Sequence, residues 1–301
     1  MNFEDAANFL WKHGRLLERR IFECVFLDGS KSNILTSLKA YQNEDGGFGH
    51  ALEPDLRVPD SQPLYMEFAL RVLYDCNIKD EELSQKACDY ISKLADLEKG
   101  IPTILSSSAK YPRAEHWNNS LSTEPSFSRL TGLVGLLKWQ GIEHSWLDKA
   151  TDICLKNISS KTYEDAHTIL TAFCLLESLP QTDYIKGLFQ KLSKDLFIAN
   201  FFRLDVDSHS YGLSPLEFSP SSTSYCRSIF SDDIILEHLK VLESQQDDDG
   251  GWHIEWEPPG ETARLEWRAY KTLKSLMILH SYNRIVQWST GKSTLQEGST
   301  N

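Results

Sequence analysis

Two copies of one short segment constrain the fold of this chain more than any other feature of its sequence. Residues 42–48 read Gln-Asn-Glu-Asp-Gly-Gly-Phe, and residues 246–252 read Gln-Asp-Asp-Asp-Gly-Gly-Trp. At the same distance after each copy comes a Glu-Pro pair, Glu53-Pro54 in one case and Glu257-Pro258 in the other. Matching flanks around a matching segment indicate an internal repeat, in which each copy connects two secondary-structure elements in the same way.

The composition of the repeated segment indicates a tight turn between two helices. Paired glycines permit a positive φ and a close approach of neighbouring backbone, and the aspartate can accept hydrogen bonds from backbone N–H groups. We expect the glutamine to cap exposed carbonyls of the preceding helix and the aromatic ring to pack over the turn. The motif is therefore predicted to fix the geometry of a hairpin made of an outer helix, the turn, a Glu-Pro loop and an inner helix.

Helical periodicity dominates the rest of the chain, and strand-like alternation is scarce. Ser231 is expected to begin a helix because Asp232 and Asp233 follow it, where acidic residues favour the helix dipole. Thr162 is expected to begin another, because Asp165 follows it three residues later in a capping-box-like arrangement. The predicted helices cover residues 3–27, 31–41, 61–76, 80–97, 126–140, 145–158, 162–179, 182–196, 231–244 and 261–280.

Some of these helices are apolar on more than one side, whereas others carry a single apolar stripe. The helices at 61–76 and 162–179 are of the first kind, and the helix at 80–97 is of the second. This alternation predicts an all-α fold with two concentric layers, an α/α toroid of helix hairpins. We expect one domain over residues 1–288 and a polar tail at 289–301. The long loops at 44–60, 100–124, 199–230 and 246–260 are expected to form the rim of a central cavity.

The repeated turn resembles the QW-type repeats of the terpenoid cyclase and protein prenyltransferase superfamily. Residues 47–57 and 252–267 also make the whole chain similar to a group of bacterial proteins of this size that are described as prenyltransferase-like. The resemblance implies an α/α toroid, and it implies an isoprenoid as the class of substrate.

Composition restricts the possible partners of the chain. Its formal net charge is −12 without an offsetting run of Lys and Arg, which argues against a nucleic-acid groove and against an anionic membrane surface as a partner. No segment has the apolar length to span a bilayer, and the N-terminus lacks the apolar region of a signal peptide. The 6 cysteines form no Cys-x-x-Cys pair and are typical of reduced thiols. We therefore expect a cytoplasmic protein that binds a small, hydrophobic molecule.

The two Glu-Pro loops supply the first candidate site. Both are expected at the same end of the barrel, near the starts of inner helices, where Glu53 and Glu257 would act as general acids. Asp55, His50 and Arg57 lie in the same loop as Glu53 and are candidates for contacts with substrate. The alternative is structural: each carboxylate would cap an inner helix or pair with a nearby arginine.

The second candidate site is the segment Asp205-Val206-Asp207-Ser208, which resembles part of the Asp-x-Asp-Asp motif of class II terpene cyclases. The resemblance implies that Asp207 protonates an alkene or epoxide and that Asp205 supports it, although Ser208 stands where the family has its last acid. Such an acid requires a dry, aromatic surround. His209 follows the segment directly and is a further candidate for substrate binding.

Aromatic side chains near the repeated turns are the expected lining of the cavity, where their faces would stabilise carbocations or stack on sugars. No metal is predicted, because the zinc ligands of protein prenyltransferases are not matched: Cys226 follows Ser224-Tyr225 rather than an acid. No cofactor is expected, apart from Mg²⁺ if the substrate carries a diphosphate. The expected lining residues are Tyr65, Phe68, Trp252, Trp256 and Trp267.

Three functions follow from these observations. The first is a terpenoid-cyclase-like or prenyl-handling enzyme that protonates an isoprenoid in an acid- and aromatic-lined cavity. The second is a carbohydrate-active enzyme of the α/α-barrel kind, with Glu53 and Glu257, or Asp207 and either of them, as the pair of carboxylates. The third is a module that binds a ligand or partner without catalysis. The shape and lining of the central cavity discriminate among the three.

Overall fold

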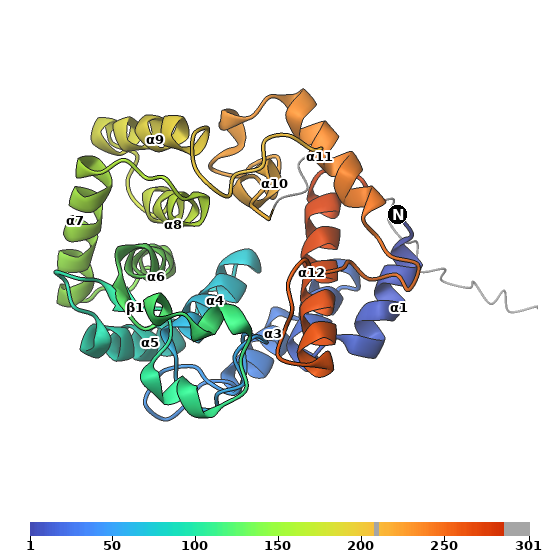
Figure 1. Ribbon diagram of the computed structural model, residues 1–301, viewed down its shortest axis with the longest axis horizontal. Coiled ribbons are helices and arrows are strands. Elements are labelled where there is room, and N and C mark those ends of the chain that lie inside the picture. The colour runs from blue at the N-terminus through green and yellow to red at the C-terminus, as the bar shows by residue number, and fades with distance from the viewer. Residues whose placement is uncertain (208–210, 286–301) are drawn as a thin grey trace, which may run out of the picture.

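The computed structural model describes residues 1–207 and 211–285, and most of these residues are helical (Figure 1). The prediction of an all-α fold is confirmed, since the strands in this part of the chain are only the short antiparallel pair β1 (Ile101–Pro102) and β2 (Pro125–Ser126). The expected tail at 289–301 lies outside the described residues. The α-helices are α1 (Phe3–His13), α2 (Leu16–Phe26), α3 (Lys31–Lys39), α4 (Pro63–Asp75), α5 (Glu81–Leu94), α6 (Phe127–Gln140), α7 (Ser145–Ser160), α8 (Ala166–Glu177), α9 (Asp183–Leu196), α10 (Pro215–Phe218), α11 (Asp232–Ser244) and α12 (Glu261–Ser281).

Figure 1 shows the helices in an inner and an outer set. Helices α4, α6, α8 and α12 surround the middle of the molecule, and α5, α7, α9 and α11 lie outside them. Helix α6 packs against both α4 and α8, while α7 and α9 pack on the outer sides of α6 and α8. From α5 to α9, outer and inner helices therefore alternate along the chain, and the inner set encloses the region that holds the candidate site.

The contrast between inner and outer helices follows from their apolar patterns. Helix α8 buries residues on most of its surface, whereas the apolar residues of α9 that are buried, Ile185, Leu188, Leu192 and Leu196, form one stripe. Helices α6 and α8 approach so closely that a Cβ atom at Gly135 would lie 2.7 Å from the backbone nitrogen of Leu175. Glycine at this position therefore permits the close contact within the inner set.

The two copies of the repeated turn have the same hydrogen bonds. Gly47 N donates to the Asp45 carboxylate at 2.9 Å, and Gly251 N donates to the Asp249 carboxylate at 3.1 Å. The first glycine of each pair has a positive φ, 88° at Gly46 and 91° at Gly250. The aromatic residue that closes each copy is fully buried. The predicted turn geometry is thus confirmed, including the role of the aspartate.

The glutamine of each copy departs from its expected role in one respect. Gln42 donates to the Gly46 carbonyl at 3.1 Å, and Gln246 donates to the Gly250 carbonyl at 3.0 Å. The prediction that each glutamine caps the preceding helix is wrong, because its side chain folds forward across its own turn. Gln246 also exchanges two hydrogen bonds with the backbone of Asn2, at 2.5 and 2.8 Å, which ties the second copy to the start of α1.

Each repeated turn packs against an outer helix that is not its own. A Cβ atom at Gly46 would meet the Lys86 carbonyl of α5 at 2.6 Å, and one at Gly250 would meet the Asp5 carbonyl of α1 at 2.3 Å. The second turn therefore lies against α1, the first helix of the chain. Helix α12 completes this contact by packing against both α1 and α2.

The largest differences from the predicted helices lie at Gly14 and at the start of α8, whereas the other predicted ends differ by up to 3 residues. The helix expected at 3–27 is interrupted at Gly14, whose extended backbone leaves no room for a Cβ atom beside the Leu10 carbonyl at 2.7 Å. The helix expected to begin at Thr162 begins at Ala166, because Asp165 is the residue that caps it, accepting from Thr168 N at 2.9 Å. The predicted start at Ser231 is confirmed, since its hydroxyl accepts from Ile234 N.

None of the helices in the described ranges combines the length and the apolar composition that crossing a membrane requires. This agrees with the expectation that the chain carries no integral membrane segment.

Candidate functional site

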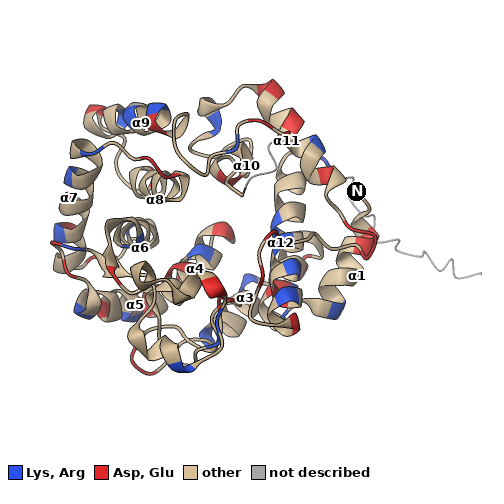
Figure 2. Cartoon of the chain, viewed as in Figure 1, with Lys and Arg blue, Asp and Glu red and all other residues tan. Residues whose placement is uncertain are grey.

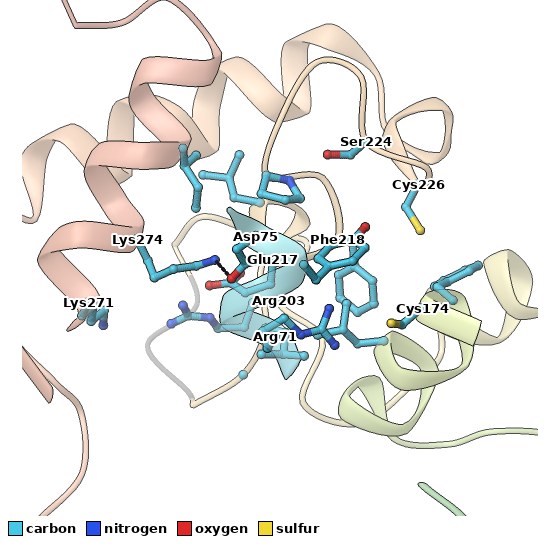
Figure 3. A pocket seen from close by; sticks show the side chains of 18 of the residues that line it. Arg71, Asp75, Cys174, Arg203, Glu217, Phe218, Ser224, Cys226, Lys271 and Lys274 are labelled. Carbon is cyan, nitrogen blue, oxygen red and sulfur yellow. Dashed lines mark hydrogen bonds and ion pairs between the residues drawn. The ribbon is translucent and has the colours of Figure 1, made fainter. Parts of the chain in front are cut away.

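A cavity of about 430 Å³ lies between α4, α8 and α12, and Arg203 together with residues between 211 and 226 closes one side of it (Figure 3). Residues from four separate parts of the chain therefore share one lining. Trp256 and Trp267, both expected to line a cavity, belong to it. The lining also includes Arg71, Tyr74, Asp75, Phe173, Cys174, Glu177, Arg203, Glu217, Glu255, Tyr270, Lys271 and Lys274.

The cavity is elongated along the inner helices. On α12, its lining residues run from Trp267 to Ile278, a distance of about 16 Å at the rise of an α-helix. On α8, the lining residues Leu170, Phe173 and Glu177 repeat at helical spacing and so lie on one face. A ligand that filled this space would be longer than it is wide.

Four basic and four acidic side chains line the cavity, and several of them neutralise each other. Lys274 pairs with Asp75 at 2.7 Å, in the middle of the view in Figure 3. Arg203 pairs with Glu255 at 3.5 Å. Figure 2 shows that α4 and α12 carry charged residues, as the outer helices do. The interior of this protein is therefore polar as well as aromatic. The charged lining residues are Arg71, Arg203, Lys271, Lys274, Asp75, Glu177, Glu217 and Glu255.

Two of these cations, Arg71 and Lys271, have no acidic partner within 4.0 Å in the described parts of the chain. The guanidinium of Arg71 lies over the ring of Tyr74, 5.4 Å from its centroid, and reaches the thiol of Cys174. Burial lowers the pKa of Lys271. Both cations lie near carboxylates of the lining without a direct ion pair, which leaves their N–H groups available to a ligand that carries an anionic group.

Glu177 is the carboxyl of the cavity whose pKa is shifted. Burial raises the pKa of Glu177, while the Tyr74 hydroxyl, which donates to it at 2.6 Å, and the charge of Arg71 oppose the shift. Glu217, by contrast, has a structural role. Its carboxylate accepts hydrogen bonds from the backbone N–H and the hydroxyl of Ser214, at 2.7 and 2.6 Å, in a capping box. Glu177 therefore has the position and the raised pKa of a proton donor.

The two glutamates that the repeat aligns lie in different environments, and neither lines the cavity. Glu53 is buried, and its pKa is raised well above the ordinary range by burial and by the charge of Asp55. Glu257 is exposed and pairs with Arg264 at 2.6 Å. The structure does not bring them together.

Asp55 lies behind the cavity wall rather than in it. Its side chain is buried, and the indole N–H groups of Trp267 and Trp256 reach its carboxylate. Arg57, two residues later, pairs with Glu266, the residue before Trp267. The loop that carries Asp55 is thus attached to α12 at two consecutive positions.

The second candidate segment lies at the surface. Asp205 and Asp207 are exposed, and Asp207 N donates to the Asp205 carboxylate at 2.9 Å in a local turn. His209 lies outside the described residues. His50 is exposed and bonds the Asn43 side chain at 2.9 Å. None of the described members of this set lines the cavity.

The remaining predicted residues are part of the packing around the site. Phe68 contacts Trp267 with ring centroids 6.3 Å apart, and so supports the cavity wall from α4. Trp252 is fully buried, and its indole donates to the Leu242 carbonyl at 2.9 Å. The Tyr65 hydroxyl bonds the backbone of Leu56 and Val58, which fixes the loop that carries Asp55.

Much of the charged lining was not predicted from the sequence, namely Arg71, Glu177, Lys271 and Lys274. A signal for them existed: Arg71 and Glu177 are charged residues within or at the end of helices that are otherwise apolar on most sides. A charge at such a position needs a partner or a cavity. No group of three or more His, Cys, Asp and Glu residues that could hold a metal ion occurs in residues 1–207 and 211–285.

Comparisons with known proteins bear on the fold alone. No family model matches the chain, and no curated protein matches it. Two solved chains have a similar structure. One is a protein from Actinoplanes, with a TM-score of 0.55 and 13% sequence identity over 93% of this chain and 98% of that one. At this identity, the likeness supports a shared arrangement of helices and carries no information on activity.

Proposed function

We propose that this chain is a prenyl-handling enzyme of the terpenoid-cyclase kind, built as an α/α toroid, which binds an isoprenoid phosphate in its central cavity and protonates it with Glu177. The observation that carries the proposal is the position of Glu177: a carboxyl with a raised pKa, held by the Tyr74 hydroxyl, inside an elongated cavity with aromatic walls.

The arrangement of the helices supports the toroid. Outer and inner helices alternate from α5 to α9, and α12, the last of the described helices, packs against α1 and α2, the first two. The repeated turn, which suggested the superfamily, repeats its hydrogen bonds in both copies. A ring of helix hairpins accounts for both observations.

The lining of the cavity supports an amphiphilic anion. Its volume of about 430 Å³ falls within the range of small-molecule sites. The rings of Phe173, Trp267 and Tyr270 offer an apolar surface to a hydrocarbon chain. Arg71 and Lys271 offer positive charge to a phosphate. An isoprenoid phosphate combines these two requirements in one molecule.

The reaction that fits is protonation of an isoprenoid double bond. The Glu177 carboxyl would transfer its proton to one alkene carbon, which leaves the positive charge on the other. The faces of Trp267 and Tyr270 would stabilise that cation, because aromatic rings attract positive charge at their faces. We assign the acid role to Glu177 in place of Asp207, because Glu177 lines the cavity whereas Asp207 lies at the surface outside it.

The test is turnover of geranyl, farnesyl and geranylgeranyl diphosphates, with products identified by mass spectrometry. We expect a cyclised or hydrated product from wild type. For Glu177→Gln, which keeps the shape of the side chain and removes the acid, we expect kcat to fall at least about 100-fold. Asp207→Asn serves as the matched control and is expected to leave kcat unchanged.

Two outcomes would contradict the proposal. The first is equal turnover by Glu177→Gln and wild type. The second is a lack of binding to any of the three diphosphates together with binding of oligosaccharides, which the acidic and aromatic lining would also accommodate. That result would favour the carbohydrate-active alternative. Binding without turnover in every variant would favour a ligand-binding module.

A further inference from the structure

The aromatic wall of the cavity is supported from behind by one buried carboxylate. Trp256 and Trp267 meet edge to face, with ring centroids 5.2 Å apart and an interplanar angle of 83°. Both rings line the cavity, and both indole N–H groups reach Asp55 on the side away from it. Only 2% of Asp55 is exposed. The positions of the two rings therefore depend on a residue that a ligand in the cavity does not contact.

The contacts between these three side chains are close but not fully formed. Asp55 Oδ1, Trp256 Nε1 and Trp267 Nε1 are all buried, and none has a hydrogen-bond partner of good geometry within the described residues. Buried donors and acceptors that face each other without ideal bonds are rare in folded proteins. The arrangement is thus one that a small movement of either ring would tighten or break.

The backbone of Asp55 is fixed more firmly than its side-chain contacts. Its carbonyl accepts from Ala114 N at 2.8 Å, and the next residue, Leu56, forms a β-bridge with Arg113. The Asp55 backbone is therefore held in place, so a change in its side chain acts on the groups that this side chain contacts, the two indoles and His116.

The charged and titratable groups near Asp55 are few. Glu53 lies in the same loop, and His116 comes from the 3-10 helix at Glu115–Asn118, with Nε2 at 3.6 Å from the Asp55 carboxylate. The positive charges of Arg15 and Arg129 act on Glu53, from the start of α2 and from α6. Burial raises the pKa of Asp55 to about 6, although the nearby indole N–H groups of Trp267 and Trp256 favour its ionised form.

We propose that Asp55 is a positioning residue, which holds the indoles of Trp256 and Trp267 in the cavity wall while it is ionised and releases them when it is protonated. A carboxylate offers an acceptor oxygen to each of the two N–H donors. A protonated carboxyl becomes a donor at one oxygen, which leaves one indole facing a donor instead of an acceptor. Ligand affinity in the cavity then follows the charge of Asp55. The inference rests on the proposed function only in its choice of ligand.

The first test needs no ligand and measures tryptophan fluorescence across the interval around pH 6. Wild type is expected to show one transition with a midpoint of about 6. Asp55→Asn is expected to show none, whereas Asp207→Asn, which removes an exposed carboxyl, is expected to keep it. Trp256→Phe and Trp267→Phe are each expected to reduce its amplitude, and the double variant is expected to abolish it. Far-UV circular dichroism checks that each variant is folded.

Two results of this titration would overturn the inference. One is a transition in Asp55→Asn with the midpoint and amplitude of wild type. The other is a transition that His116→Gln abolishes and Asp55→Asn leaves intact, which would assign it to the imidazole. If Asp55→Asn does not fold, His116→Gln decides the question, because it retains the carboxyl and both indoles and must keep the transition at its midpoint; loss of the transition would overturn the inference.

The second test measures the affinity of farnesyl diphosphate by calorimetry above and below the transition. The diphosphate itself gains a proton in this pH range, which also changes its affinity. Because Asp55→Asn lacks the carboxyl, the pH dependence of its affinity measures this contribution of the ligand alone. Wild type is expected to lose about tenfold more affinity than Asp55→Asn as the pH falls. An equal loss in both would contradict the coupling. If farnesyl diphosphate does not bind at any pH while the fluorescence transition persists, the proposed function fails and the role of Asp55 remains.

Discussion

Burial raises the pKa of two carboxyls near the cavity, Asp55 behind its aromatic wall and Glu177 inside it. The two differ in their partners. Asp55 faces indole N–H groups that favour its ionised form, whereas Glu177 meets a tyrosine hydroxyl and the positive charge of Arg71. In both cases the neighbouring groups favour the ionised form and burial outweighs them, so the two carboxyls differ mainly in place: Asp55 lies behind the wall, whereas Glu177 lines the cavity.

The raised pKa of Asp55 predicts a particular dependence of stability on pH. Between its ordinary value of 3.8 and its folded value of about 6, the folded chain binds more protons at this site than the unfolded chain does. The contribution of Asp55 to stability is therefore largest below 3.8 and is lost as the pH rises to about 6. The shift in pKa corresponds to a change of about 3 kcal/mol in the free energy of unfolding across this interval.

Asp55→Asn is expected to remove the dependence of stability on pH that comes from this carboxyl. Urea unfolding of wild type and variant, below pH 3.8 and above pH 6, measures the effect. The quantity to compare is the free energy of unfolding of the variant minus that of wild type. We expect this difference to be about 3 kcal/mol larger at neutral pH than at the acid end of the interval. Asp207→Asn controls for the loss of a surface carboxyl. A difference between Asp55→Asn and wild type that stays constant with pH would contradict the assignment.

At the scale of elements, the sequence predicted most helices because apolar periodicity and local turn chemistry determine them. The aspartate and the glycines of the repeated turn act on atoms a few residues away, so their roles could be predicted. The interruption at Gly14 could not, because it depends on the space beside the Leu10 carbonyl. The start of α8 was misplaced because Thr162 and Asp165 are both common capping residues, and only the structure shows which one is used.

The second repeated turn supplies a prediction about glycine. Gly250→Ala combines a positive φ of 91° with a Cβ atom 2.3 Å from the Asp5 carbonyl, so we expect it to cost about 3 kcal/mol or more. Gly141→Ala is the matched control, because Gly141 has a φ of 82° and nothing within 4 Å of the added atom. The control is expected to cost about 1 kcal/mol. Chemical denaturation of both variants checks the comparison, and equal costs would show that the contact with α1 is unimportant.

At the scale of the whole molecule, the cavity is formed by residues that lie far apart in the sequence. Tyr74 meets Glu177, and Asp75 meets Lys274. No local pattern encodes such pairs, which is why the sequence indicated an acid- and aromatic-lined cavity but not its charged residues. Trp256 and Trp267 were predicted because they lie near the repeated turn, whose position in the fold could be inferred.

The junction of the two ends of the chain gives a prediction for the whole molecule. Gln246→Ala and Gln42→Ala each remove a hydrogen bond within a repeated turn, but Gln246 also binds the backbone of Asn2. We expect Gln246→Ala to increase hydrogen exchange in α1 by about tenfold, which corresponds to the loss of about one hydrogen bond. Gln42→Ala is expected to leave α1 unchanged. Equal exchange in α1 for the two variants would show that the ends are held together in another way.

The most direct test of the central claim is a crystal structure of the protein with a non-hydrolysable analogue of farnesyl diphosphate. We predict that the hydrocarbon chain lies between α4, α8 and α12, with the phosphates within hydrogen-bond distance of Arg71 or Lys271 and the chain in reach of Glu177. An analogue bound elsewhere while the cavity stays empty, or phosphates directed away from both cations, would contradict the account.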